Sequence, residues 1–266
     1  MKRSIPFRQH IISYKTIGCG PRFILAMHGV GQDCSAYDFL EGSLDGYTLI
    51  VPDLPFHGDT QWRNATVTEE DMTGLIHALM QEHQAAKIHL VAYSIGAKAA
   101  GVFVRHEPDK VLSLMYIAPD GIKERKVYVL ATRTFIGRLL FRAICAFPAI
   151  SRLGIRIGGA LRLVKKTDAA FMTAMLKDRN RTAALYRIWT GYSKLHSRTG
   201  ELVRQIRDYH IPFTLVTGNF DAITPSRHMN ALTLAISHTR HIALPRAHNL
   251  LGKGLVITFV NHFKSL

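Results

Sequence analysis

Residues 87–97 read Lys-Ile-His-Leu-Val-Ala-Tyr-Ser-Ile-Gly-Ala, an apolar run that reaches Ser94 and continues in small, helix-favouring residues. An apolar run of this length predicts a buried strand followed by a helix. A sharp strand-to-helix turn would lift the serine hydroxyl out of the sheet, and small residues two positions before and after it, Ala92 and Gly96, would let strand and helix approach closely. An ordinary serine in a strand-to-helix turn would show the same sequence pattern. This stretch alone therefore does not identify Ser94 as a nucleophile, and other parts of the chain are needed.

The rest of the chain alternates strand and helix patterns. Five short apolar runs bounded by turn residues predict buried parallel strands, at 22–27, 47–51, 87–93, 111–118 and 212–217. Two further runs, 11–16 and 240–244, predict edge strands. Thr68 and Asp71 form a capping box before a helix, and weaker helical patterns cover 95–106, 225–237 and 250–263. The fold class is therefore α/β, with a doubly wound, mostly parallel sheet.

Polar residues follow these strands directly, where doubly wound sheets bind their ligands. Run 22–27 is followed by His28-Gly29-Val30-Gly31-Gln32, run 212–217 by Asp221, and run 240–244 by His248. A serine hydroxyl is a poor nucleophile unless a histidine accepts its proton and a carboxylate orients that histidine. Ser94, Asp221 and His248 supply these three groups in this chain order.

The chain resembles the α/β-hydrolase superfamily, in its serine-nucleophile branch. That chain order, a His-Gly loop after an early strand and an Asp-x-Pro-x-His-Gly segment, here residues 53–58, recur in the family. The resemblance covers residues 20–120 and 206–264. It implies a sheet of the α/β-hydrolase type with an inserted helical lid, a catalytic triad of Ser94, Asp221 and His248, and an oxyanion hole formed by the backbone N–H groups of Val30 and Ile95.

The resemblance also implies supporting loops, leaves a second candidate for the acid, and shows three departures from the family pattern. The supporting loops would be formed by His28, Gly29, Gly31 and Gly96. Asp120 is the alternative acid, because some family members place the carboxylate after that strand. Three positions depart from the family pattern in residues that are commonly glycine, namely Phe56, Ala92 and Ala247.

Charge divides the chain into two parts. Residues 121–205 hold 18 Lys and Arg against 4 acids, whereas the remainder holds 16 against 15. We therefore predict a core domain from 1–120 and 206–266, and a strongly basic helical cap or lid at 121–205. Pro148 and the glycines at 154, 158 and 159 indicate several short helices within it. Its basic face is either simply solvated, or it docks on an anionic membrane surface or an anionic carrier such as an acyl-carrier thioester.

Other patterns exclude several functional classes. Cys19, Cys34 and Cys145 form neither a disulfide framework nor a metal-spacing cluster, and no glycine-rich phosphate loop is present. We therefore expect free thiols, no cofactor and no metal. Aromatic residues are not interleaved with the basic ones as in nucleic-acid-binding modules, so no nucleic acid is expected. Without a signal peptide or a long apolar segment, we expect a cytoplasmic protein, peripheral at the membrane if the lid docks there.

The predicted activity follows from the serine. Epoxide hydrolases and haloalkane dehalogenases of this fold use aspartate at the same turn, which leaves acyl transfer to water. We therefore predict a serine hydrolase, of carboxylesterase or lipase type, that cleaves an ester or thioester of a hydrophobic small-molecule acyl substrate through an acyl-enzyme. Two alternatives stay open: a triad-bearing enzyme that cleaves carbon–carbon bonds or catalyses eliminations, and a noncatalytic ligand-binding or membrane-associated protein on the same fold.

Overall fold

Eight strands form one sheet in the computed structural model, in which residues 2–124, 126–160 and 179–264 are described. The strand order is β1-β2-β4-β3-β5-β6-β7-β8. β1 and β2 pair antiparallel, as do β2 and β4, and every later pair is parallel. The predicted doubly wound, mostly parallel sheet is confirmed. Its strands are β1 Lys2–Phe7, β2 His10–Ile17, β3 Arg22–Met27, β4 Tyr47–Pro52, β5 Ile88–Tyr93, β6 Val111–Ile117, β7 Phe213–Gly218 and β8 Arg240–Leu244.

One strand was not predicted, and it changes the edge of the sheet. β1 pairs with β2 from Lys2 opposite Lys15 to Phe7 opposite His10. The prediction that run 11–16 is an edge strand is therefore wrong, whereas β8 does form the other edge. β1 buries only Ile5 and Phe7, so its weak apolar pattern gave little signal of a strand.

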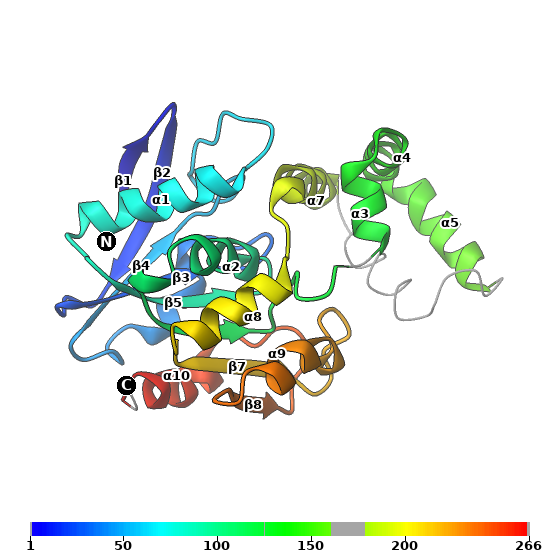
Figure 1. Cartoon of the computed structure of the whole chain (residues 1–266). Coiled ribbons are helices and arrows are strands. Elements are labelled where there is room, and N and C mark those ends of the chain that lie inside the picture. Colours follow the sequence, from blue (N-terminus) through cyan, green and yellow to red (C-terminus); the bar gives the residue numbers. More distant parts are fainter. Residues whose placement is uncertain (1, 125, 161–178, 265–266) are drawn as a thin grey trace. The chain divides into compact units, whose positions relative to one another are not determined.

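Helices cover both faces of the sheet. On one face α2 packs against β5 and β3, with α1 and α8 beside it (Figure 1). On the other face the apolar core joins the 3₁₀ helix η1 and helix α10 to the strands, with Tyr37 and Phe259 fully buried. The helices of this part and the short 3₁₀ turns are η1 Cys34–Leu40, α1 Glu69–Glu82, α2 Gly96–His106, η2 Pro108–Lys110, α8 Thr199–Asp208, η4 Ser226–Met229, α9 Asn230–Ala235, η5 Lys253–Leu255 and α10 Val256–Lys264.

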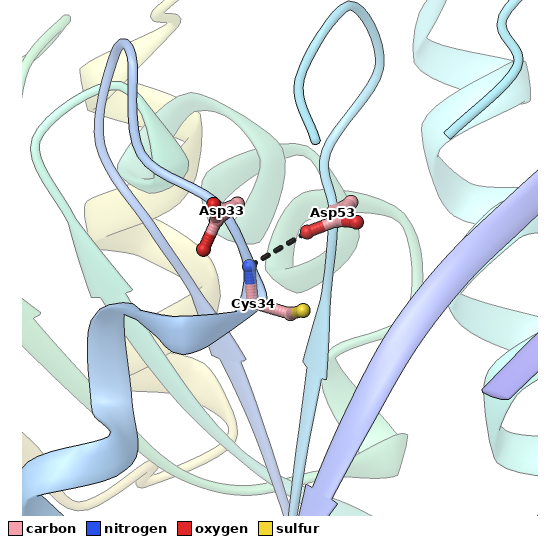
Figure 2. A group of neighbouring side chains, drawn as sticks. All are labelled: Asp33, Cys34 and Asp53. Carbon is pink, nitrogen blue, oxygen red and sulfur yellow. Dashed lines mark hydrogen bonds between the residues drawn. The ribbon is translucent and has the colours of Figure 1, made fainter. Parts of the chain in front are cut away.

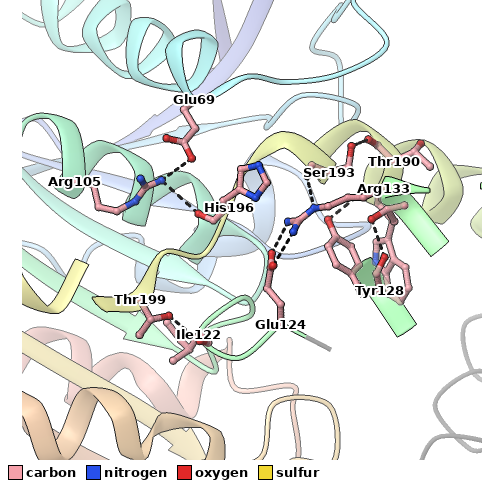
Figure 3. Close-up of polar contacts among 12 residues, drawn as sticks. Glu69, Arg105, Ile122, Glu124, Tyr128, Arg133, Thr190, Ser193, His196 and Thr199 are labelled. Atoms are coloured by element: carbon pink, nitrogen blue, oxygen red, sulfur yellow. Dashed lines mark hydrogen bonds and ion pairs between the residues drawn. The ribbon is translucent and has the colours of Figure 1, made fainter. Parts of the chain in front are cut away.

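The chain divides into two compact units. Unit 1 comprises residues 1–123 and 195–266 and contains the sheet, and unit 2 comprises residues 124–194. The predicted insertion, 121–205, extends further toward the C-terminus than unit 2. The cause is α8, which belongs to unit 1, where Arg105 on α2 bonds the Glu201 carboxylate on α8. Arg105 also bonds Glu69 and the His196 carbonyl (Figure 3). The lid function of the insertion stays a prediction.

Unit 2 is helical and has a small core of its own. Phe141 packs on Trp189 and Tyr186, with ring centroids 5.6 and 5.3 Å apart. Arg133 bonds the Glu124 carboxylate through two nitrogens and the Ser193 carbonyl through Nε, so it joins the first and last segments of the unit (Figure 3). Its described elements are α3 Lys126–Arg133, α4 Phe135–Ala146, α5 Pro148–Ala160, α7 Arg179–Gly191 and η3 Tyr192–Lys194.

The helix breaks expected within this unit are partly right. Pro148 begins α5, where its missing N–H costs nothing. Gly154 and the glycine pair at 158–159 lie inside the same helix, so the prediction that they interrupt it is wrong. A single glycine costs a helix only about 1 kcal/mol, so it weakens a helix without ending it. Across the described residues, no helix has the length and apolar character needed to cross a membrane.

Two buried histidines belong to a series of polar contacts that joins strands β5, β6 and β7 to helix α10. The His89 ring on β5 lies 2.9 Å from the Ser113 hydroxyl on β6, which is 3.4 Å from Nε2 of His262 on α10. The other ring nitrogen of His262 lies 2.9 Å from the Thr214 hydroxyl on β7. Burial lowers the pKa of His89 and of His262 to about 4. Both rings are therefore neutral in the native protein near neutral pH.

This network predicts acid sensitivity. Because the unfolded chain binds protons at these two histidines below pH 6.5 whereas the native state does not, stability is full above that pH and is lost as pH falls toward 4. Each ring contributes about 1.4 kcal/mol per pH unit in this window. We expect His262→Asn to reduce the slope of unfolding free energy against pH by about one proton, measured by urea unfolding between pH 5 and 6.5. The exposed His210→Asn is the control, and an unchanged slope in the His262 variant contradicts the prediction.

Candidate active site

Ser94 lies in a strained turn between β5 and α2. Its φ is 51°, a left-handed conformation that side chains other than glycine rarely adopt, and it is 8% exposed. The turn is held by its own N–H, which donates to the Ile117 carbonyl on the neighbouring strand, and by its carbonyl, which accepts from the Asp120 N–H. Neighbouring strands therefore determine the position of the serine, and strain of this kind is typical of functional sites.

Three side chains from separate strand ends form a hydrogen-bonded relay. The Ser94 hydroxyl lies 3.0 Å from Nε2 of His248, and Nδ1 of the same ring lies 2.8 Å from an Asp221 carboxylate oxygen. Ser94 follows β5, Asp221 follows β7 and His248 follows β8, and the parallel direction of these strands brings their carboxyl ends to one edge. The structure thus brings together the three residues that the sequence selected. His248 bonds Asp221, so the structure favours this acid over Asp120.

The loops that carry the acid and the base are tied together. The Asn219 N–H donates to the Leu244 carbonyl at 2.8 Å, and the Phe220 N–H donates to the Arg246 carbonyl at 3.0 Å. These bonds extend the pairing of β7 and β8 beyond the ends of the strands. The relative position of Asp221 and the histidine loop is therefore determined by backbone geometry.

Asp221 accepts a full set of hydrogen bonds. One carboxylate oxygen accepts the N–H groups of Ile223 and Thr224, each at 2.8 Å. The other accepts His248 Nδ1–H and the Thr224 hydroxyl, also at 2.8 Å. Burial favours the neutral acid, but these bonds and the histidine outweigh it, so the pKa of Asp221 lies below its usual value. The carboxylate stays charged and holds the imidazole in the tautomer whose Nε2 faces Ser94.

Val30 and Ile95 offer backbone N–H groups at the same edge. Within the described residues neither group has a hydrogen-bond acceptor. Gly96 brings the two loops together, because a Cβ at this position would lie 2.6 Å from the Met27 carbonyl oxygen at the end of β3. Free N–H groups beside a serine nucleophile are what an oxyanion requires. Their assignment to an oxyanion hole stays a prediction.

The loop that carries Val30 is held by side chains. The Gly29 N–H donates to the Gln32 side-chain oxygen at 2.9 Å, and Gly31 adopts a φ of 72° within the turn. His28 is fully buried, accepts the Leu54 N–H on Nε2 and bonds the Gly29 carbonyl through Nδ1. Burial and the neighbouring His57 lower the pKa of His28 to about 3. His28 is thus a neutral link between two loops and not a proton carrier.

The second loop at this edge contains Asp53, Phe56 and His57. His57 lies against His28 with ring centroids 4.9 Å apart, bonds the Pro55 carbonyl and has its pKa lowered by burial. Phe56 adopts a φ of 69°, which explains why glycine is common at this position in the family. The departure from glycine at Phe56 therefore carries backbone strain.

Among the described residues, one group of side chains has ligand atoms spaced for a metal ion: Asp33, Cys34 and Asp53 (Figure 2). The Asp53 carboxylate accepts the Cys34 N–H at 2.6 Å and the Asp59 N–H at 2.9 Å, and Lys2 lies 3.5 Å away. Burial and the Asp53 charge raise the pKa of the Cys34 thiol to about 11. A protonated thiol and a carboxylate that already binds backbone N–H groups favour a structural turn over a metal site.

Sequence reasoning missed two supports of the relay. The Tyr93 hydroxyl donates to the His248 carbonyl at 3.0 Å, and its ring would be 2.8 Å from a Cβ at Gly29. Tyr93 therefore contacts both the histidine loop and the Val30 loop, which no local pattern indicates. Thr224 was visible in principle, since Asp-Ala-Ile-Thr is the kind of sequence in which an aspartate caps a turn.

Comparison with known proteins supports the fold. The family model described as alpha/beta hydrolase fold matches residues 24–254. A curated relative, the dihydrolipoyllysine-residue acetyltransferase component of the acetoin cleaving system of Cupriavidus necator, is 32% identical over 111 residues. That match covers 41% of this chain and 30% of the relative. The chain thus matches less than a third of that protein.

Solved structures resemble the whole chain at low sequence identity. An alpha/beta hydrolase enzyme from a Medee basin deep-sea metagenome library superposes with a TM-score of 0.73 at 12% identity, covering 98% of this chain and 97% of the other. A thermophilic esterase from Thermogutta terrifontis gives 0.69 at 17% identity, covering 100% and 97%. At these identities the likeness concerns the fold alone.

Proposed function

The chain belongs to the α/β-hydrolase fold family, and from this premise we propose that it is a serine hydrolase that cleaves esters or thioesters of hydrophobic acyl groups. The observation that carries the proposal is the relay in which His248 lies 3.0 Å from the Ser94 hydroxyl and 2.8 Å from Asp221. Both distances lie within the range that proton transfer and charge stabilisation require.

The geometry supports a two-step reaction. Ser94 Oγ attacks the acyl carbon while His248 Nε2 takes its proton, and the carbonyl oxygen becomes an anion bound by the N–H groups of Val30 and Ile95. Collapse of this intermediate breaks the bond to the leaving alcohol or thiol, which receives the proton from His248. Water then attacks the acyl-enzyme with His248 as base again. The bond from the acyl carbon to Ser94 Oγ breaks, Ser94 takes its proton back from His248, and the acid is released. Asp221 stays charged throughout and stabilises the imidazolium.

A hydrophobic acyl group fits the surroundings of the relay. Phe220, beside Asp221, exposes 71% of its surface, so a large apolar side chain stands next to the acid of the relay. The alternatives, carbon–carbon cleavage and binding without catalysis, would use the same three residues differently. Product analysis distinguishes them: an ester or thioester hydrolase releases an acid, a carbon–carbon hydrolase cleaves its substrate at a carbon–carbon bond, and a binding protein forms no product.

A panel of esters and thioesters of graded acyl length tests the proposal. We expect kcat/KM to rise roughly fourfold for each added methylene until the pocket is filled, because each buried methylene contributes about 0.8 kcal/mol. Ser94→Ala serves as the blank for every substrate. Wild-type rates equal to the blank for all esters and thioesters would overturn the proposal, and cleavage of a vinylogous diketone by the same preparation would then favour the carbon–carbon alternative.

A further inference from the structure

Exposed apolar side chains are concentrated in three consecutive helices of unit 2. Ten of the sixteen large hydrophobic residues that stand exposed among the described residues lie in or beside α3, α4 and α5. Scattered exposed apolar residues are normal on a protein surface, whereas a concentration of this kind marks an interaction site. The ten are Val127, Leu130, Phe135, Ile136, Leu139, Leu140, Phe147, Ile150, Leu153 and Ile157.

On α4, some of these apolar side chains lie on the same side of the helix as an arginine. Phe135, Leu139 and Arg142 are spaced four and three residues apart, so they lie along one side of the helix. Both apolar members are at least 60% exposed, and Arg142 is exposed as well. Another side of α4 is directed inward, since Phe141 and Cys145 are buried in the unit. The helix therefore has an inner face that unit 2 already uses and an outer apolar face flanked by basic charge.

The following helix repeats this arrangement. Ile150, Leu153 and Ile157 of α5 lie at positions i, i+3 and i+7 and are between 52 and 69% exposed, whereas Ile155 is buried. Arg156, beside Leu153 and Ile157, is exposed. Two successive helices thus present an apolar face with arginine beside it, which is more than a single irregular patch.

The charge of this segment points to the kind of partner. From residue 126 to residue 160 the sequence holds six basic residues and no acidic one. An apolar helix face bordered by arginine suits the interface of a bilayer, where apolar side chains enter the acyl region and the cations meet anionic headgroups. A partner that offers only acidic side chains would pair with the arginines but would leave most of this apolar surface in water.

We propose that the exposed faces of α3, α4 and α5 form a peripheral docking surface for anionic lipid bilayers. The partner is the bilayer surface itself, and this proposal does not depend on the reactivity of Ser94. Binding requires both an apolar interface and negative headgroups, so it weakens as salt screens the charge.

Vesicle sedimentation of the full chain tests the charge requirement. We expect the protein to bind vesicles that contain phosphatidylcholine with 30% phosphatidylglycerol, added as the probe lipid, and to remain free with phosphatidylcholine alone. Arg138→Glu with Arg142→Glu should lower the partition coefficient roughly 25-fold or more, since each basic residue near the surface contributes about fivefold. Arg204→Glu with Arg207→Glu, on exposed positions of α8, is the matched control and should bind as the wild type does.

Fluorescence tests the apolar requirement and stays informative if the arginine variant is unstable. A Phe135→Trp variant should show an emission shift to shorter wavelength with the anionic vesicles, measured as a difference from the wild type. Leu234→Trp on α9, at a position that is 84% exposed, should show no shift. Equal binding to neutral and anionic vesicles, no binding to either, or binding only to an acidic carrier protein would each overturn the proposal.

Discussion

Replacing Ser94 by alanine is expected to lower kcat for the best ester of the panel by about 10⁵- to 10⁶-fold. In the proposed reaction the hydroxyl attacks the acyl carbon, and within the relay it lies 3.0 Å from His248. Without it the imidazole has no proton to take, and only binding and the N–H donors can assist water. Stopped-flow initial rates for the wild type and overnight endpoint assays for the variant together measure a loss of this size.

Ser197→Ala is the matched control for this variant. The Ser197 hydroxyl is buried and has no hydrogen-bond partner among the described residues, so its removal leaves the relay intact. We expect wild-type rates from this variant and unchanged thermal unfolding from both. If Ser94→Ala keeps more than a tenth of wild-type activity, another group is the nucleophile.

Asp221→Asn is expected to lower kcat by about 10⁴-fold. An amide can face His248 with its nitrogen, which stabilises the tautomer that has no lone pair directed at Ser94, and it provides no charge for the imidazolium. The three hydrogen bonds that Ile223 and Thr224 donate to the carboxylate would also weaken, because an amide oxygen is a weaker acceptor than a charged carboxylate oxygen. Steady-state kinetics on one ester measures the effect.

Asp120→Asn tests the alternative acid in the same assay. The Asp120 backbone N–H bonds the Ser94 carbonyl, and this bond survives a change of side chain. We therefore expect less than a tenfold loss from this variant. A larger loss from Asp120→Asn than from Asp221→Asn would show that the relay uses the other carboxylate.

Most of the sheet could be predicted from the sequence because the central strands β3 to β7 are almost entirely buried and therefore read as apolar runs. β3 and β8 run over the predicted residues, and the other predicted strands differ by a residue or two at their ends. β1 was missed because only Ile5 and Phe7 of its six residues are buried. Its place in the sheet depends on pairing with β2, which is a contact between segments that a local pattern does not reveal.

The relay could be predicted in part for a different reason. Chain order and position after a strand selected Ser94, Asp221 and His248. They did not exclude Asp120 as the acid, because Asp120 and Asp221 follow neighbouring strands. The choice depends on the bonds between the β7 and β8 loops, such as the one from the Phe220 N–H to the Arg246 carbonyl. Tyr93 and Gln32 were missed because their partners lie in other loops or on the backbone.

The central claim is that Ser94 is an activated nucleophile, and covalent labelling tests it most directly. The full chain is incubated with a fluorophosphonate and digested, and the modified peptide is identified by mass spectrometry. The relay predicts one adduct on Ser94, none in Ser94→Ala, and much slower labelling in Asp221→Asn. An unlabelled wild type, or an adduct at another residue that persists in Ser94→Ala, would contradict the claim.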